Sequence, residues 1–193
     1  MDLACDREFR ERRAPAWHLP GTLPSWSSAL PGTPSSSSAD DFKHGISTFG
    51  DLKYPTNFQH FDYVNPSAPK GGAVKFGVEG GFNNLNQFLL KGLSASGLSA
   101  LYDSLMEGND DEIAARYALV AQGVKLAPNK MSLEFKLNPK ARFHDGVAIT
   151  ADDVVFTFNA LLKDGHPSYK MALRDVAKVE KISSHHVKFT FKN

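Results

Sequence analysis

The stretch from Ala141 to Leu162, ARFHDGVAITADDVVFTFNALL, constrains the fold of this chain more than any other. Asp145-Gly146 is a turn dipeptide, because glycine readily takes the positive φ that a tight reversal needs. Thr150 follows at the position of a helix N-cap, with Asp153 at the acidic position of a capping box. The residues after it recur at helical spacing and predict one buried stripe made of Val154, Val155, Phe158, Leu161 and Leu162.

Composition and charge exclude several classes of protein. Hydrophobic residues make up 41% and charged residues 22% of 193 residues, and the formal net charge is +1, which gives no general basic field for nucleic acid. No run approaches the about 20 apolar residues of a transmembrane helix. One cysteine excludes an internal disulfide framework and a cysteine-rich metal site.

The first 43 residues differ in texture from the rest. Mixed charges, five prolines and the serine run at 35–38 interrupt any periodicity, so we expect 1–43 to be a disordered leader or a mis-assigned start. No signal-peptide pattern is recognisable there, because the apolar stretch that such a signal requires is missing. From His44 onward the chain has the texture of a folded domain, and residues 44–193 form the second predicted unit.

Alternation and spacing predict further elements downstream. The segment AVKFGVEG, residues 73–80, alternates apolar and small or polar residues and predicts a strand, and VKLAPNKMSLEFKL predicts two strands about Pro128-Asn129. Leu98, Leu101, Tyr102 and Leu105 have the spacing of a short amphipathic helix, and residues 113–121 form a weaker helical piece. A last strand, VKFTFK, follows a turn at Ser183–His186.

Two segments resemble a known family. FxLxxxARFHDGxxITADDVVFTFxAL resembles the most recognisable segment of the family 5 extracellular solute-binding proteins, the peptide-binding components of ABC importers. HGxSxFGDLKYPxxFxHFDYVNPxAPKGG, from His44, resembles the start of the mature protein in the oligopeptide and microcin C branch. The resemblance implies an α/β, periplasmic-binding-protein-like type II fold, of which this chain would be the N-terminal portion of solute-binding lobe I.

The resemblance also implies a function and a location. Such a protein captures a peptide or peptide-like ligand in the periplasm and delivers it to the ABC permease and ATPase subunits of an importer, with no cofactor and no chemistry of its own. Lys91, Gly92 and Leu93 follow the family's LNPxxxxG segment beside the cleft, although Gln87 replaces its proline, and Tyr169 takes the place of an aromatic residue near the ligand.

From the length of the chain, we expect it to be only part of a complete solute-binding protein. Residues 44–193 would cover about the first quarter of such a protein, so the second lobe and the hinge would lie beyond Asn193, and the chain alone should bind peptides weakly or not at all. The alternative is a non-binding relic or interaction fragment of such a protein.

Two further hypotheses concern histidines. His144 and Asp145 allow a hydrolytic enzyme, but neighbours in sequence seldom form a catalytic hydrogen bond and no GxSxG motif accompanies them. We therefore predict no catalytic residue. His185-His186 could supply half of a metal site, but adjacent strand residues point to opposite faces, so a solvated turn is the prediction there.

Overall fold

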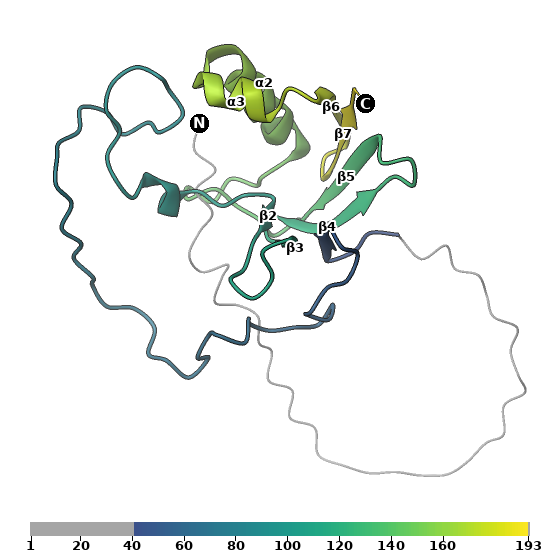
Figure 1. The fold of residues 1–193 in the computed structure, drawn as a ribbon, viewed down its shortest axis with the longest axis horizontal. Coiled ribbons are helices and arrows are strands. Elements are labelled where there is room, and N and C mark those ends of the chain that lie inside the picture. The colour runs from purple at the N-terminus through teal and green to yellow at the C-terminus, as the bar shows by residue number, and fades with distance from the viewer. Residues whose placement is uncertain (1–40, 193) are drawn as a thin grey trace, which may run out of the picture.

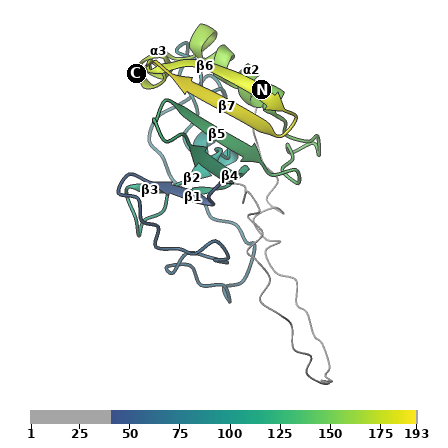
Figure 2. The ribbon, with the colours of Figure 1, turned by 90° about the vertical axis from the view of Figure 1, so that its right-hand side faces the viewer.

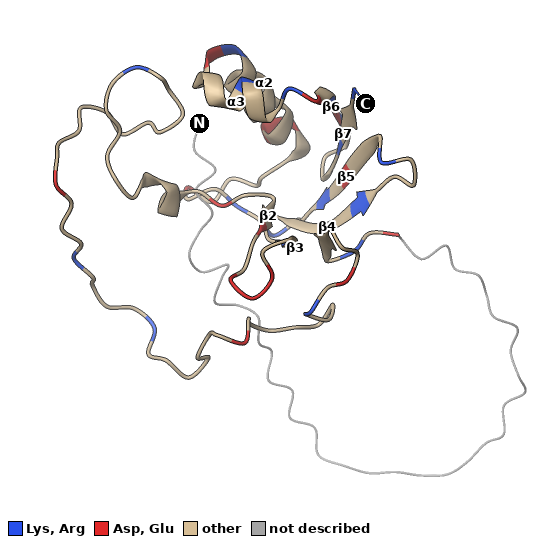
Figure 3. Ribbon diagram, in the orientation of Figure 1, with Lys and Arg blue, Asp and Glu red and all other residues tan. Residues whose placement is uncertain are grey.

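The structure, a computed structural model, describes residues 41–192 and consists of two antiparallel sheets, with two helices beside the larger one (Figure 1). Within this range no helix has the length and apolar character needed to cross a membrane. Basic and acidic residues are interspersed along the ribbon, and acidic residues gather in the loop between β2 and β3 (Figure 3). The expectation for the leader lies almost wholly outside the described residues.

The larger sheet has the strand order β4-β5-β7-β6, with β4 at Ala121–Leu126, β5 at Ser132–Leu137, β7 at His186–Phe191 and β6 at Val176–Ser183. All of its neighbours are antiparallel (Figure 2). The hairpin predicted about Pro128-Asn129 is confirmed, because β4 pairs with β5 across that turn. The predicted last strand is confirmed as β7.

Helix α2, Ala151–Asp164, forms where the sequence predicts it, and the short helix α3, Pro167–Ala172, follows. The Thr150 amide donates a hydrogen bond of 2.8 Å to the Asp153 carboxylate, which satisfies an amide that the first turn leaves unpaired. Val154 and Phe158 are buried, and the helix packs against β6 and β7. Val155, Leu161 and Leu162 are half-buried, so the predicted stripe is confirmed with a narrower buried centre.

The turn before α2 is also confirmed. Gly146 has φ 85°, and its amide donates to the Phe143 carbonyl at 2.9 Å. The Phe143 amide donates to the Val147 carbonyl at 2.8 Å, which closes the reversal. A small core of Val120, Ala141, Phe143 and Ile149 holds this turn beside the larger sheet.

The smaller sheet has the order β1-β3-β2, with β1 at Gly45–Ser47, β3 at Ala115–Ala118 and β2 at Met106–Glu107. The prediction of a helix over residues 113–121 is wrong, because this stretch forms β3 and the start of β4. Its inward residues follow the strand period: Ala115 and Tyr117 are buried while Arg116 between them is exposed. The aromatic side chains of Tyr54, Phe58 and Phe61, from the loop that follows β1, cover Tyr117 and supply the contacts that stabilise the strand.

The short helix predicted from Leu98 is present as one turn of 3-10 helix, η1, at Leu98–Leu101. Leu98 is buried, whereas Leu101 is exposed. Tyr102 leaves the turn with extended backbone, so the chain straightens before Leu105 and enters β2. The amphipathic helix predicted here is therefore reduced to its first turn.

The strand predicted at residues 73–80 does not form in the described structure. Val74, Phe76 and Val78 are exposed, Phe76 to 86%, and the chain runs there as an extended excursion away from both sheets (Figure 1). A strand needs a neighbouring edge to satisfy its backbone groups. On one edge of the larger sheet, Lys43 already pairs with Val124 through two hydrogen bonds of 2.8 Å. Phe42 also contacts the sheet, through the ring of His186 on β7. Phe42 and Lys43 therefore pack on the folded domain although the predicted boundary of that domain lies after Lys43.

Candidate ligand-binding site

The loop that contains three of the predicted site residues is closed by two asparagines. The amides of Asn83 and Asn84 donate to the Leu93 carbonyl at 3.0 and 3.2 Å, and the Leu93 amide donates to Asn83 Oδ1 at 2.7 Å. Asn84 Nδ2 donates to the Lys91 carbonyl at 3.1 Å. We call residues 83–95 the asparagine loop. Its ends are held together locally, so Lys91, Gly92 and Leu93 lie in a defined backbone.

Gly92 is required by this geometry. Its φ is 91°, a conformation that side chains other than glycine rarely adopt. A Cβ at this position would lie 2.7 Å from Asn84 Nδ2 and 2.8 Å from Asn83 Oδ1, which is inside van der Waals contact. The role of Gly92 in the structure is therefore to let the two asparagine side chains approach the backbone.

Tyr169, the fourth predicted residue, is brought to the asparagine loop through Phe88. The two rings lie 6.2 Å apart between centroids, and Phe88 packs edge-on against Tyr102 at 5.0 Å. The His166 amide, at the N-cap of α3, donates to the Phe88 carbonyl at 2.7 Å. The structure thus joins α3 to the loop, with Phe88 between Tyr169 and the rest of the site.

A cavity of about 440 Å³ lies beside this junction, between the asparagine loop and α2. None of the four predicted residues lines it. The residues that line it come from three segments, 86–89, 99–104 and the outer side of α2 with the turn after it: Asn86, Gln87, Phe88, Leu89, Ser99, Tyr102, Asp103, Ser104, Phe156, Thr157, Ala160, Leu161, Asp164 and Gly165. We call this cavity the α2 pocket. Sequence reasoning missed it.

A signal for the α2 pocket was present in the sequence. Phe156 lies off the buried stripe of α2, and its side chain is 55% exposed. A large aromatic residue on the polar side of an amphipathic helix indicates a binding surface or a further packing contact. The partners from residues 86–104 could not be found in this way, because they approach α2 only in the folded chain.

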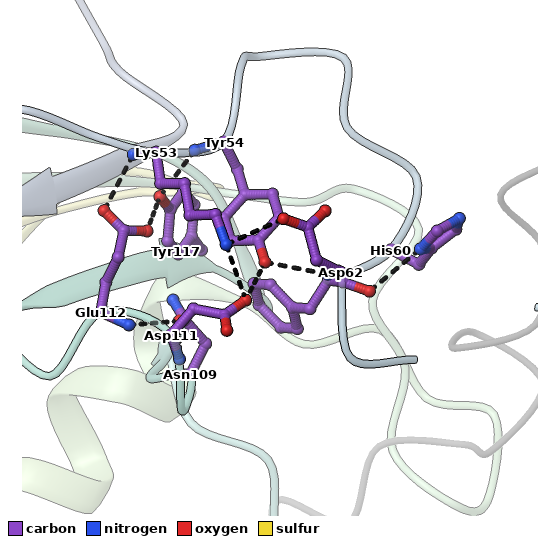
Figure 4. A network of polar contacts seen from close by, with 9 residues as sticks. Lys53, Tyr54, His60, Asp62, Asn109, Asp111, Glu112 and Tyr117 are labelled. Atoms are coloured by element: carbon purple, nitrogen blue, oxygen red, sulfur yellow. Dashed lines mark hydrogen bonds and ion pairs between the residues drawn. The ribbon is translucent and has the colours of Figure 1, made fainter. Parts of the chain in front are cut away.

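A second group of polar residues, none of which lines the α2 pocket, fastens the 53–63 loop to the segment 109–117 (Figure 4). Lys53 Nζ forms ion pairs with Asp62 at 2.8 Å and Asp111 at 3.2 Å. The Tyr54 hydroxyl donates to Asp111 and accepts from the Asp62 amide at 2.9 Å. We call this group the Lys53 network. Its charges are satisfied within the group.

The pKa values of the Lys53 network follow from these contacts. The hydrogen bond from the Tyr54 hydroxyl, with the nearby Lys53 ammonium, holds the pKa of Asp111 below its ordinary value. The hydrogen bond to Asp62 is the largest of the effects that raise the pKa of Lys53. Burial raises the pKa of Tyr54 and of the neighbouring Tyr117, whose hydroxyl accepts from the Tyr54 amide and donates to Glu112. All four groups therefore keep their neutral-pH charge states, which suits a structural role.

The histidines considered from the sequence occupy structural positions. Asp145 Oδ1 accepts from the Val147 amide at 3.0 Å, so the carboxylate stabilises the turn, and His144 is exposed. His186 Nε2 lies 2.9 Å from a carboxylate oxygen of Glu134 on the neighbouring strand. Within residues 41–192, no group of three or more potential ligand side chains has the arrangement of a metal site.

Comparison with known proteins gives the family. The model of the bacterial extracellular solute-binding proteins, family 5 Middle, matches residues 115–193. The chain is 42% identical over 156 residues to the peptidoglycan-binding protein YepA of Agrobacterium fabrum, which covers 77% of this chain and 25% of that protein. It is 41% identical over 162 residues to the probable peptide-binding protein YejA of the same organism, and this match covers 84% of this chain and 26% of YejA.

The chain belongs to the family 5 extracellular solute-binding proteins, and its mixed sheet and helix architecture is part of their type II periplasmic-binding fold, as the sequence predicts. It spans about a quarter of the length of these relatives. The oligopeptide-binding protein AppA from Bacillus subtilis, solved with a nonapeptide, overlaps 47% of this chain and 18% of its own at 28% identity and a TM-score of 0.40, an overlap that supports no further conclusion.

Proposed function

We propose that this chain is part of the substrate-binding component of an ABC importer that captures peptides or peptide-like solutes in the periplasm. The observation that carries the proposal is the 41–42% identity to two proteins whose names state peptide and peptidoglycan binding. The captured ligand would pass to the permease and ATPase subunits of the importer. Binding rather than chemistry is the function of the family.

The asparagine loop supports the proposal because it leaves one apolar side chain and one glycine backbone accessible to a ligand. The Leu93 amide and carbonyl are both used inside the loop, so this residue offers a ligand its exposed apolar side chain rather than its peptide groups. Gly92, without a side chain, leaves its backbone open to close approach. Lys91, Gly92 and Leu93 would thus border the ligand, and Tyr169 would act through its contact with Phe88.

Amide chemical shifts of the ¹⁵N-labelled 193-residue chain, titrated with a mixed pool of short peptides, test the proposal. We expect weak, saturable binding with shifts concentrated in residues 83–95 and around Tyr169, because one pocket wall offers few of the hydrogen bonds that a two-sided cleft supplies. Gly92→Ala, which disturbs the loop, should weaken binding. Saturable shifts confined to residues far from this loop would overturn the proposal, and a chain that shows no shift at all would favour the alternative of a non-binding relic or interaction fragment.

A further inference from the structure

We propose that the α2 pocket is a side-chain subsite for a basic residue of the ligand, a lysine or arginine whose aliphatic stem lies on the aromatic wall. The proposal rests on the peptide-binding function proposed above and names the ligand chemistry of one pocket. Three features of the pocket carry it: its apolar wall, the charge of its lining, and its position next to the asparagine loop.

The wall of the pocket suits a long apolar stem. Phe88, Leu89, Phe156 and Leu161 line it, together with the ring of Tyr102. Phe156 is 55% exposed although it stands on a well-formed helix, so much of its ring is accessible to an incoming group. Burial of a lysine or arginine stem against such rings is favourable because these side chains combine an apolar body with a charged end. The cavity of about 440 Å³ is in the range of small-molecule sites.

The acidic residues that line the pocket favour a positively charged group of the ligand. Asp103 and Asp164 line the pocket, and no lysine, arginine or histidine is among the lining residues of the described chain. Lys163 stands on the same turn as Asp164 but outside the lining. Asp164 is the last residue of α2, where the helix dipole is negative, so the carboxylate and the dipole both favour a cation at this end of the pocket.

The position of the pocket connects it to the proposed peptide path. Residues 86–89 form both the wall of the pocket and the first half of the asparagine loop. A peptide main chain that follows Lys91, Gly92 and Leu93 would have a side chain within reach of this wall. Cation-π contact with Tyr102 or Phe156 adds to the attraction of the carboxylates.

Two blocked tripeptides that differ in one side-chain charge test the proposal on the ¹⁵N-labelled 193-residue chain. The probes are acetyl-Ala-Lys-Ala-amide and acetyl-Ala-norleucine-Ala-amide, which share an apolar stem and lack terminal charges. We expect the lysine probe to bind about three- to fivefold more tightly, the size expected of exposed ion pairs. Amide shifts should appear at residues 86–89, 102–104 and 156–165, and high salt should remove the preference.

Matched variants separate charge from shape. Asp164→Asn should bring the lysine probe to within about twofold of the norleucine probe, whereas Asp51→Asn, which removes a charge from an exposed residue outside the pocket, should leave the preference intact. Phe156→Ala should weaken both probes, because it removes the shared apolar wall, and should weaken the lysine probe more, because it also removes a cation-π partner.

The outcomes distinguish this inference from the proposed function. Equal affinity of the two probes, or shifts that avoid the pocket, would overturn the inference while peptide binding itself stands. An unchanged lysine preference in Asp164→Asn would also overturn it. Binding of the lysine probe in the α2 pocket, with no response to the peptide pool at the asparagine loop, would instead leave the basic subsite in place and contradict the proposed function.

Discussion

The hydroxyl of Tyr54 shows how a single polar atom holds the 53–63 loop in place. Its ring is 4% exposed and packs against Phe58, Phe61 and Tyr117, while its hydroxyl lies within the Lys53 network. A buried aromatic body with a satisfied hydroxyl is the arrangement in which tyrosine stabilises most. The hydroxyl is therefore a specific contributor and can be tested apart from the ring.

We predict that Tyr54→Phe lowers the free energy of unfolding by about 0.5–1.5 kcal/mol, because the Asp62 amide and the Asp111 carboxylate each lose a partner. Tyr63→Phe is the matched control: the Tyr63 ring stacks on Phe61 but is half exposed, so the loss of its hydroxyl should change little. Urea unfolding of both variants measures the difference. Equal effects would show that the network contributes nothing through Tyr54.

Asp111 gives a pH-dependent prediction. Its pKa is lowered in the folded state by the Tyr54 hydroxyl and by Lys53, so the unfolded chain binds this proton more tightly. The stability that Asp111 contributes is present above its unfolded pKa, about 3.9, and is lost as the pH falls through the lower folded value. We expect Asp111→Asn to flatten the decline of unfolding free energy below about pH 4.

A series of urea unfolding curves from neutral pH to about pH 2.5 checks this expectation. Asp51→Asn serves as the control, because Asp51 is exposed and lies outside the Lys53 network, and this variant should keep the wild-type slope. An Asp111→Asn protein with the same pH dependence as the control would contradict the contacts described for Asp111.

Among the elements, helix α2 carries a packed phenylalanine and an exposed phenylalanine only two residues apart. Phe158 is 7% exposed and packs edge-on against Phe189 at 6.2 Å, whereas Phe156 faces the α2 pocket. Phe158→Ala should therefore cost about 3–5 kcal/mol of unfolding free energy. Phe156→Ala should change it by no more than about 0.5 kcal/mol.

Thermal or urea unfolding of the two alanine variants gives this comparison directly, since the chemical change is identical. A cost for Phe156→Ala that matches Phe158→Ala would mean that the outer side of α2 is packed in the folded chain. The α2 pocket would then be closed, and the basic-residue subsite would lose its wall.

The asparagine loop gives a second test at this scale. Gly92→Ala should open the loop, because the new Cβ would lie under 3.0 Å from both asparagine side chains. Gly71→Ala is matched in backbone conformation, with φ 92° against 91°, but has open space around it. Hydrogen exchange at the amides of Asn83, Asn84 and Leu93 should accelerate in Gly92→Ala and stay unchanged in Gly71→Ala. Equal exchange rates in both variants would show that Gly92 is needed only for its positive φ and not for the close approach of the asparagine side chains.

Elements with local causes were predictable from the sequence. The turn at Asp145-Gly146, the cap at Thr150 and the hairpin about Pro128-Asn129 each depend on residues a few positions apart, and all three are present. The segment 73–80 shows the limit of alternation. Its pattern is that of a strand, but a strand also needs a paired edge, which the segment does not find within residues 41–192.

The candidate site shows the same division between local and long-range causes. Resemblance indicated Lys91, Gly92, Leu93 and Tyr169, and the structure places the first three in one closed loop with Tyr169 joined to it through Phe88. Whether they bind ligand stays a prediction. Only Phe156 gave a signal for the α2 pocket in the sequence, because Tyr102 and the other lining residues of 86–104 reach the helix only in the folded chain.

For the molecule as a whole, we propose that residues 44–193 supply a functional part of a peptide-binding cleft. The matched part of this chain spans only 25–26% of the relatives. We propose that the parts of a relative outside the match provide the opposing wall. The contribution of this chain can therefore be measured in the context of a complete relative.

The most direct measurement is calorimetric titration of a graft with short peptides. Residues 44–193 replace the matching region of the probable peptide-binding protein YejA of Agrobacterium fabrum, and the unmodified relative and a graft carrying Gly92→Ala are measured beside it. We expect the graft to bind peptides within about tenfold, or 1.4 kcal/mol, of the unmodified relative, and the Gly92→Ala graft to bind more weakly. A folded graft that binds no peptide, while the unmodified relative does, would contradict the proposal that residues 44–193 form part of the cleft.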